Sequence, residues 1–447
     1  MIDSRRPTGA GYSHNFGGAN WKDRRIKRQE YLDREPTVLV VGGSQAGLTV
    51  AARLGRLGVD TLVVDKHERV GDNWRKRYHA LVLHNHVGIN HLPYMPFPPN
   101  WPLYLPKDMV ADWLESYAWA MEMNFWTGTE FTGGTYDKAA GHWKAVVRRA
   151  DGSERTLFPR HIIFANGIIG LPRIPDIPGL EDFKGDLMHT SQFTSGAHWQ
   201  GKKALVLGSG TSGHDVAQDL YSNGVDTTII QRGSTIVVNI PSARLAYGIH
   251  DDGTPLEDAD LLVTVNTLPV TIRNLQRVTA RMAERDKELL DGLTTRGFKW
   301  DFGEDKAGHL MKSRKRLGGY YLNAGCSELI VSGDIGLLQF DQIEKFVAEG
   351  ALLKDGSVKP ADLLVLATGF FTQQVLVASL LGEEVAERVG TIWGLSPNGE
   401  LNNMWTRTAQ EGLWFVGGSF INCRIYSKYV ALQIKAIEEG LLSKSIS

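Results

Sequence analysis

Val38-Leu39-Val40-Val41-Gly42-Gly43-Ser44-Gln45-Ala46-Gly47 is the stretch of sequence that decides the fold. Its four leading apolar residues are typical of a strand buried on both faces in a parallel sheet. The glycines that follow predict a tight strand-to-helix turn whose backbone N–H groups can face a phosphate. A helix is expected over 48–57 and a second strand over 61–64, so this stretch opens a βαβ unit.

The same plan returns later in the chain, because Gly208 follows Gly42 by 166 residues. An apolar run over 204–207 leads into this second glycine loop, and a further strand is predicted over 227–230. Gly-Val-Asp precedes the second strand of both units, at 58–60 and at 224–226. Each glycine-loop βαβ unit can bind one dinucleotide. The chain is therefore predicted to be an α/β protein with two doubly wound, Rossmann-like domains.

The first glycine loop is predicted to hold FAD. Ser44 replaces the middle glycine of the G-x-G-x-x-G pattern; its side chain narrows the approach of a phosphate, but its hydroxyl can also bond to one. Asp65 ends the second strand, 23 residues after Gly42, where an acid accepts hydrogen bonds from the ribose hydroxyls of adenosine. The residues assigned to this site are Gly42, Ser44, Gln45, Ala46, Gly47, Asp65 and Lys66.

The second glycine loop is predicted to hold NADPH. Gln231 stands where the first unit has Asp65, and Arg232 follows it. An acid there would repel a 2′-phosphate, whereas an amide and a guanidinium offer hydrogen-bond donors to it. The alternative is that Arg232 is a solvated charge at the end of a strand. The residues assigned to this site are Gly208, Gly210, Thr211, Ser212, Gly213, Gln231, Arg232 and Ser234.

Composition excludes several classes of protein. The 447 residues carry a formal net charge of -1, so neither nucleic acid nor a membrane surface is an expected partner. Cys326 and Cys423 are far apart, which argues against a disulfide framework, a zinc site or a redox dithiol. No apolar run approaches the roughly 18 to 20 residues of a membrane span, and no apolar leader follows the first residues. We therefore expect a cytoplasmic protein.

The predicted organisation has four parts, of which the second and the last form one domain. A polar, basic extension comes first and is expected to be an arm over the surface or a helix. The mainly helical insertion is placed at about 240–335. The parts are the extension 1–35, the FAD-binding domain 36–180, the NADPH-binding domain 181–340, and the rest of the FAD-binding domain 341–447.

A stretch between the two loops, Phe183 to Phe193, resembles the F-x-G-x-x-x-H-x-x-x-[YF] signature of the flavin-containing monooxygenases. Departures from the family pattern are Ser44, Asp72 and Asn166. Four further segments are similar to motifs of that family: Val70 to Arg75, Leu92 to Pro98, Leu366 to Phe370, and Gly412 to Gly417. On this basis Asp72, Trp74, Arg75, Thr368, Gly369 and Gly418 are also assigned to cofactor binding.

This resemblance implies a reaction as well as a fold. NADPH would reduce FAD, which would form a C4a-(hydro)peroxide with O₂ and transfer one oxygen atom to a small organic substrate by N- or S-oxygenation or hydroxylation. His84 falls where the family places a donor beside the flavin, so His84 and Asn85 are the catalytic candidates, and His84 also counts as cofactor-binding. His189 is expected to organise the linker between the domains. A helix over 427–439 is expected to point its N-terminus at the flavin.

Alternatives stay open at this point. A Baeyer–Villiger monooxygenase shares the architecture, although its signature ends in Trp where this chain has Phe193-Thr194. An NADPH oxidase or reductase and a non-catalytic binding module of the same fold are the others. His86 and His91 are also close in sequence, and the His84-x-His86 pair could suggest a metal, but a metal is disfavoured because no carboxylate or third ligand lies at a convincing spacing. The expected partners are a small molecule and O₂, with a homodimer left open.

Overall fold

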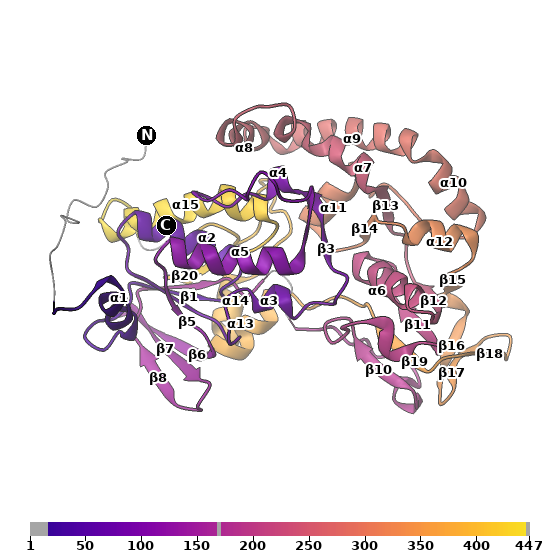
Figure 1. Cartoon of the computed structure of the whole chain (residues 1–447), viewed down its shortest axis with the longest axis horizontal. Helices are drawn as coiled ribbons and strands as arrows, with labels where there is room; N and C mark the ends of the chain where they lie inside the picture. Colours follow the sequence, from indigo (N-terminus) through magenta and orange to yellow (C-terminus); the bar gives the residue numbers. More distant parts are fainter. Residues whose placement is uncertain (1–16, 168–170, 444–447) are drawn as a thin grey trace.

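The computed structural model describes residues 17–167 and 171–443, and it has two lobes that lie side by side (Figure 1). Each lobe is built on a parallel sheet of five strands. The strand order is β20-β9-β1-β2-β5 in the first sheet and β10-β19-β11-β12-β15 in the second. This arrangement confirms the predicted α/β class with two Rossmann-like units.

The first lobe is centred on strands whose residues are almost all buried and apolar. Two long helices, α5 and α15, pack against α2, the helix that follows the first glycine loop. The elements are β1 (Val38–Val41), β2 (Thr61–Val64), β5 (Asn124–Trp126), β9 (His161–Phe164), β20 (Leu413–Phe415), α2 (Gln45–Arg56), α5 (Lys107–Ala120) and α15 (Phe420–Glu438).

The second lobe repeats the plan with its own glycine loop between β11 and α6. Its five strands again form a parallel sheet, of which the three central strands β19, β11 and β12 are buried, and α6 packs on β11 and β12. The elements are β10 (Asp186–His189), β11 (Lys203–Leu207), β12 (Asp226–Gln231), β15 (Gly336–Gln339), β19 (Leu363–Leu366) and α6 (Thr211–Ser222).

The internal repeat covers whole domains rather than one βαβ unit each. In each unit a three-stranded antiparallel sheet comes just before one strand of the parallel sheet: β6-β7-β8 before β9 in the first unit, and β16-β17-β18 before β19 in the second. The edge strand beside β9 is β20, and the edge strand beside β19 is β10. The second unit is therefore inserted between β9 and β20 of the first. The antiparallel strands are β6 (Thr129–Asp137), β7 (His142–Arg149), β8 (Glu154–Leu157), β16 (Ile343–Val347), β17 (Gly350–Leu353) and β18 (Val358–Pro360).

One predicted boundary needs correction. The sequence placed the return to the FAD-binding domain at residue 341, but β19 still pairs with β10 and β11 in the second sheet. The first sheet resumes only at β20, which pairs with β9. A buried apolar run predicts a parallel strand without saying which of two similar sheets it joins. The pairing of β19 with Ala204–Leu207 of β11 decides the matter.

The described part of the N-terminal extension contains a helix that covers one edge of the first sheet. Helix α1 (Trp21–Glu30) lies against the edge strand β5, where the Trp126 indole donates to the backbone oxygen of Gln29. Arg25 donates to Asn124 at the same edge. Covering an edge strand removes a surface that could pair with another chain. Residues 1–16 of the predicted extension lie outside the described residues.

The insertion after β12 is mainly helical, in agreement with the prediction, but it also contains a parallel pair of strands. Its helices form the upper part of the second lobe in Figure 1. Within residues 17–167 and 171–443, no helix is long and apolar enough to span a membrane. The elements are β13 (Ile236–Asn239), α7 (Ile240–Ala243), η3 (Arg244–His250), α8 (Leu256–Thr264), α9 (Leu268–Arg285), α10 (Lys287–Thr295), α11 (Gly308–Lys315), β14 (Tyr320–Asn323) and α12 (Cys326–Ser332).

Candidate active site

The first glycine loop has the tight geometry that its glycines predict. Gly42 has a φ of 106°, and a Cβ there would lie 2.7 Å from the backbone oxygen of Ala165. A Cβ on Gly47 would lie 2.0 Å from the oxygen of Gly42, so only glycine allows the helix to start this close to the strand. The Ser44 hydroxyl is turned towards the side chain of Gln45, at 2.5 Å from Oε1. The hydroxyl is therefore bonded to the neighbouring side chain and does not cap the backbone N–H groups at the start of α2. These N–H groups stay available to a phosphate.

Asp65 closes this loop from the end of β2. Its Oδ2 accepts from the Gly43 backbone N–H at 2.7 Å, and its Oδ1 accepts from the backbone N–H and ring Nδ1 of His67. Burial raises the pKa of the carboxyl, but these hydrogen bonds outweigh burial, so the pKa lies below its usual value. The carboxylate is therefore charged, as a ribose acceptor has to be, and its contact with a ribose stays a prediction. The neighbouring Lys66 is exposed.

Three segments that are far apart in the sequence meet beside the first loop. The Trp74 indole donates to Oε1 of Gln45 at 3.2 Å, and Nε2 of Gln45 donates to the backbone oxygen of Gly418 at 3.3 Å. Ala46 is buried behind them. Three residues that the sequence assigned to cofactor binding therefore surround one place at the N-terminus of α2.

The C-terminal helix begins earlier than predicted. The expected start was residue 427, whereas α15 begins at Phe420 and the Ser419 hydroxyl caps it by accepting from Asn422 N–H. Ser419 has the short polar side chain that favours an N-cap, and this signal was missed. The N-terminus of α15 therefore stands beside Gly418 and Gln45, where its dipole favours negative charge.

Arg75 and Asp72 form a different arrangement from the one expected. The Arg75 guanidinium donates to Asp72 at 3.1 Å, to Asp112 at 2.7 Å and to Glu115 at 3.1 Å. These contacts brace the short helix α3 (Asp72–Arg75) against α5. Direct contact of Asp72 and Arg75 with a cofactor stays a prediction.

The second glycine loop matches the first in geometry. Gly208 has a φ of 125°, and a Cβ on it would lie 2.4 Å from the backbone oxygen of Ala367. A Cβ on Gly213 would lie 2.0 Å from the oxygen of Gly208. At Gly210, a Cβ would meet nothing within 4 Å, so this position faces open space at the start of α6. Room for a pyrophosphate therefore exists where the motif requires it.

Two other residues of this loop have separate surroundings. The Thr211 hydroxyl donates to the backbone oxygen of Tyr320 at 3.0 Å, which ties the start of α6 to β14. Ser212, the next residue, is half-buried. Both residues begin the helix whose N-terminus faces the open space at Gly210.

The expected role of Gln231 needs correction. Its side chain is completely buried, with Nε2 donating to the Lys299 backbone oxygen and Oε1 accepting from Lys299 N–H, both at 2.8 Å. The amide is thus used to hold the insertion against β12 and is not offered to a phosphate. Arg232 is exposed, and the Ser234 hydroxyl donates to Asp301. The prediction of a 2′-phosphate site therefore rests on Arg232 and no longer on Gln231.

Thr368 and Gly369 follow β19 and so lie beside the second loop, not the first. Ala367 packs under Gly208 and Gly213 as Ala165 packs under Gly42 and Gly47. Thr368 donates to the Arg173 backbone oxygen at 2.6 Å, and His189 Nε2 lies 3.0 Å from the oxygen of Gly369. His189 is buried in this joint, which supports its expected linker role.

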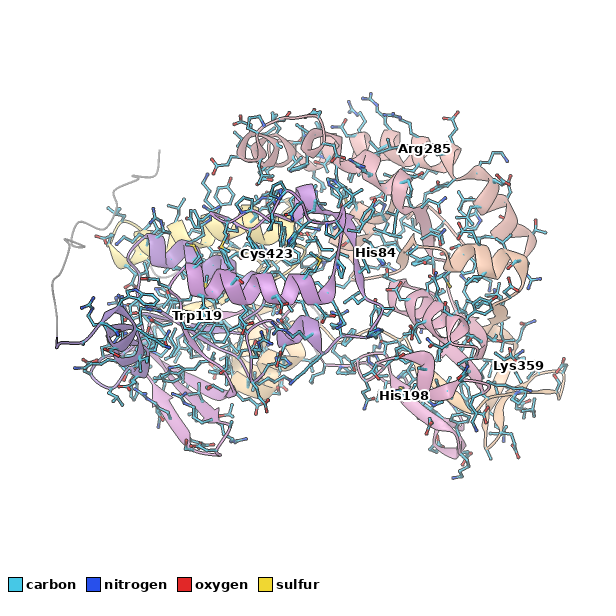
Figure 2. The ribbon with its side chains drawn as sticks, in the orientation of Figure 1. His84, Trp119, His198, Arg285, Lys359 and Cys423 are labelled. Carbon is cyan, nitrogen blue, oxygen red and sulfur yellow. The ribbon has the colours of Figure 1, made fainter. Side chains whose placement is uncertain are left out.

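His84 and Asn85 lie on β3 (Val82–His86), and Figure 2 shows His84 between the two lobes. They line a small cavity that α7 and η3 of the insertion close from the other side. His84 Nε2 is 3.8 Å from an oxygen of Asp215, which belongs to α6 of the second lobe. The remaining lining residues are His86, Tyr104, Ile240, Ala243, Arg244 and Tyr247. The catalytic candidates thus stand where both nucleotide-binding units and the insertion meet.

An ion pair that the sequence did not reveal fixes the insertion to the first lobe. Arg424 of α15 makes two hydrogen bonds of 2.7 Å to Asp260 of α8. The same guanidinium donates to the backbone oxygens of Ile89 and His91, and His250 lies 3.2 Å from Asp260. Arg424 is 4% exposed. No local pattern links residues 164 positions apart, so only the folded chain shows this contact.

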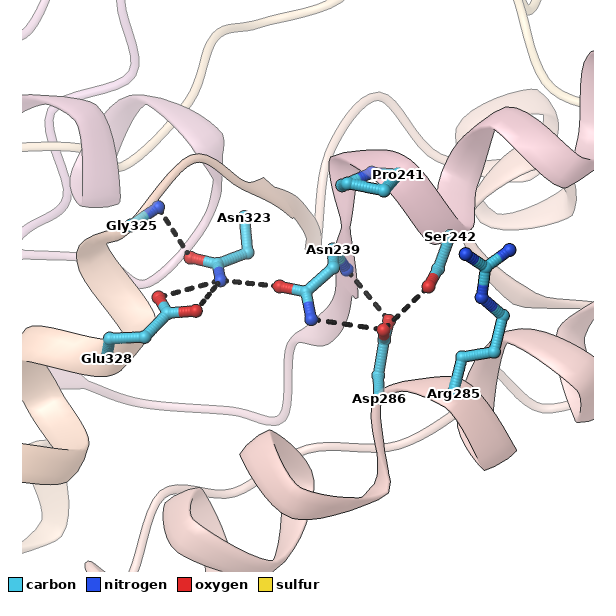
Figure 3. A pocket seen from close by; sticks show the side chains of 8 residues that line it. All are labelled: Asn239, Pro241, Ser242, Arg285, Asp286, Asn323, Gly325 and Glu328. Carbon is cyan, nitrogen blue, oxygen red and sulfur yellow. Dashed lines mark hydrogen bonds between the residues drawn. The ribbon is translucent and has the colours of Figure 1, made fainter.

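A second cavity, of about 420 Å³, lies in the insertion (Figure 3). Its buried carboxylate, Asp286, accepts from Asn239 and from the Ser242 hydroxyl, while Asn323 donates to Asn239 and Glu328. These polar groups satisfy one another and pin the junction of α9 and α10 to the ends of β13 and β14. Figure 2 shows Arg285, at its rim, well away from His84. In the described residues, no three His, Cys, Asp or Glu side chains gather to hold a metal ion.

Two Rossmann-like units, joined at a cavity with polar donors, define an oxidoreductase that uses two dinucleotides. A family model described as flavin-binding monooxygenase-like matches residues 65–386, and one for an FAD binding domain matches residues 35–86. The chain belongs to the flavin-binding monooxygenase-like family. It is a flavin-dependent monooxygenase that uses FAD and NADPH.

The chain is also similar to individual flavin-dependent monooxygenases, in sequence or in fold. Indole-3-pyruvate monooxygenase YUCCA1 of Oryza sativa subsp. japonica is 30% identical over 338 residues, which are 75% of this chain and 77% of the rice protein. The flavin-containing monooxygenase from Stenotrophomonas maltophilia has a TM-score of 0.61 at 18% identity, over 90% of this chain and 98% of that one. Cyclohexanone monooxygenase from Rhodococcus sp. Phi1 has a TM-score of 0.59 at 18% identity, over 91% and 85%. The two structural similarities concern the fold.

Proposed function

We propose that the protein transfers one atom of O₂ to a small organic substrate that binds beside His84 and Asn85, where the insertion opens away from β3. The observation that carries this proposal is the position of β3, which brings both side chains to the junction of the two lobes. Substrate, O₂, NADPH and one proton give oxygenated substrate, water and NADP⁺. Bound FAD supplies the transfer of electrons to O₂, and the protein supplies position and shelter from water.

The residues of this chain have separate tasks in the proposal. The first loop and Asp65 bind the adenosine diphosphate part of FAD, and the second loop and Arg232 bind NADPH. His84 and Asn85 present hydrogen-bonding groups to the cavity. Gly210 leaves open space for a phosphate, and the charged Asp65 suits a ribose, so the two loops fit the groups assigned to them.

A specific substrate is suggested by the relatives. The rice enzyme is named for indole-3-pyruvate, which combines a flat ring with a carboxylate. The cavity beside His84 has Tyr104 and Tyr247 in its wall and Arg244 at its side. Aromatic side chains can stack on a ring, and a guanidinium can pair with a carboxylate. The cavity has a volume of only about 10 Å³, and Arg244 already pairs with Asp251 at 2.6 Å, so this substrate requires the insertion to move away from β3. Indole-3-pyruvate is therefore the second candidate, after the broader class of small heteroatom compounds.

The test is to supply ¹⁸O₂ and NADPH with candidate amines, sulfides, ketones and indole-3-pyruvate. A monooxygenase places one ¹⁸O atom in the product for each NADPH used. Insertion of oxygen into a ketone would move the protein to the Baeyer–Villiger class. Complete conversion of NADPH to hydrogen peroxide with every compound would make it an oxidase and would overturn the proposal.

A further inference from the structure

Asp215 is a buried carboxylate that the two-cofactor mechanism leaves without a task. It lies in α6, two residues after the last glycine of the second loop, and only 10% of its side chain is exposed. Burial raises the pKa of this carboxyl, while His84, Tyr78 and Arg77 oppose that shift. A buried carboxylate charge costs free energy unless it is paired. The groups that pair with Asp215 therefore indicate what it does.

Both close partners of Asp215 come from one segment of the first lobe. The Tyr78 hydroxyl donates a short hydrogen bond to Oδ2, and His84 Nε2 lies 3.8 Å from Oδ1. Tyr78 is packed into the core of the second lobe with Phe193 and Val216. His79 adds a backbone hydrogen bond to Thr194. The segment that leads into β3 is therefore fastened to the second lobe, and Asp215 is at the point of attachment.

The geometry leaves the two nitrogens of His84 with different surroundings. Nε2 faces the carboxylate at an ion-pair distance that is too long for a direct hydrogen bond. Nδ1 is on the other side of the ring from this contact, and His84 is one of the residues that line the cavity. A carboxylate beside one ring nitrogen draws the proton to that nitrogen and so decides which nitrogen can accept.

We propose that Asp215 is a positioning residue that holds the His84 imidazole with its proton on Nε2 and presents Nδ1 to the cavity. This inference rests on the proposed function for the cavity itself, but it can be tested without turnover. It also connects the helix that begins at the NADPH loop to the side chain beside the flavin. Placement of the second lobe then decides the orientation of His84.

The test reads the tautomer of His84 from ¹⁵N shifts of ring-labelled protein, at a pH where histidine is neutral. The wild-type protein should show the Nε2–H form, and this measurement needs no variant. Asp215→Leu removes the acceptor and should abolish that preference, whereas Asp215→Asn keeps an acceptor oxygen and should retain most of it. Asp219→Leu, the same change one turn further along α6, is the matched control. The double variant Tyr78→Phe/Asp215→Leu leaves no unpaired hydroxyl and guards against misfolding.

Other charged and titratable groups near His84 and Asp215 can also change the ¹⁵N shifts of His84. Those that face this pair from the packed elements are Arg77, Tyr78, His86, Tyr104, Arg244, Tyr247, Tyr321 and Cys326. An Nδ1–H tautomer in the wild-type protein would overturn the proposal, as would an unchanged tautomer in folded Asp215→Leu protein.

Turnover gives a second, separable readout. Asp215→Leu should raise the hydrogen peroxide released per product about ten-fold, while the KM for NADPH changes little, because a small displacement of a polar group disturbs the reacting geometry. A tautomer change without any change in coupling would support the positioning role and count against His84 as a catalytic residue. Equal effects of Tyr78→Phe and Asp215→Leu on coupling, with the tautomer unchanged, would reduce Asp215 to an anchor for Tyr78.

Discussion

Ser44 and Gly210 occupy the same position in the two glycine loops and have nearly the same backbone conformation, with φ and ψ of −93° and −166° at Ser44 and −81° and −174° at Gly210. Each is the N-cap of its helix. The loops therefore differ at this position in their side chain and not in their fold. A side chain is tolerated in the first loop, while the second keeps the space open.

Gly210→Ala should weaken NADPH binding without damaging the protein. A Cβ at this position meets no protein atom within 4 Å, so the free energy of unfolding should change by no more than about 1 kcal/mol. The methyl group would occupy space needed by the pyrophosphate, and the Kd for NADPH should rise about ten-fold or more. Gly213→Ala is the control: its Cβ would lie 2.0 Å from the Gly208 oxygen, so it should lower the melting temperature strongly. Unchanged NADPH affinity in Gly210→Ala would show that the phosphate lies elsewhere.

Arg232→Ala should change the choice of pyridine nucleotide. Arg232 is exposed, so its removal should leave stability unchanged. A guanidinium that meets a 2′-phosphate contributes on the order of 1.5 to 3 kcal/mol, or about ten- to hundred-fold in affinity. The KM for NADPH should rise at least about ten-fold at low salt, and its salt dependence should flatten. Equal losses with NADPH and NADH, or any loss in the control Arg281→Ala, would contradict this role.

Asp65→Asn should remove a pH-dependent part of stability. Burial raises the pKa of Asp65, but hydrogen bonds from His67 and Gly43 have the larger combined effect and hold the pKa below its usual value. A depressed pKa stabilises the folded protein above the unfolded value, and this contribution is lost as the pH falls through the folded value. The difference in unfolding free energy between wild type and Asp65→Asn should thus be largest near neutral pH and shrink below about pH 4. A difference that is constant over this range would mean that the charge of Asp65 does not stabilise the loop.

His84→Ala should affect coupling more than reduction. The variant should still be reduced by NADPH, since His84 lies outside both glycine loops. Loss of one hydrogen bond to a charged group costs about 1.5 to 3 kcal/mol, which corresponds to a roughly ten- to hundred-fold rise in peroxide released relative to product. An oxygen-electrode assay with catalase measures this ratio. Full coupling in His84→Ala would return His84 to a structural role; His198→Ala, an exposed histidine of the second lobe, should behave like the wild type.

Asp260→Asn should destabilise the protein by about 3 to 5 kcal/mol, because it leaves the buried Arg424 guanidinium without its charged partner. Chemical denaturation measures this loss. Glu154→Gln breaks the exposed pair with Arg148, in which both side chains are about half exposed, and should change stability by less than about 1 kcal/mol. Equal effects of the two substitutions would show that the ion pair between α8 and α15 contributes no more to the free energy of unfolding than an exposed pair does.

Sequence alone was sufficient for features that depend on neighbouring residues. The strands β1 and β2, both glycine loops and the helices that follow them were predicted closely, because strand, turn and helix are encoded by residues next to one another. The repeat between Gly42 and Gly208 then predicted two dinucleotide sites. The cap at Ser419 was also within reach of local reasoning and was overlooked.

Other features were decided only by the tertiary structure. Whether β19 joins the first or second sheet, and whether Gln231 faces a nucleotide or the backbone of Lys299, depends on which distant segments pack together. The same is true of Arg424 with Asp260, and of His84 with Asp215, which come from different lobes. Such contacts form because buried polar groups must find partners wherever the fold brings them. No spacing along the chain records that choice.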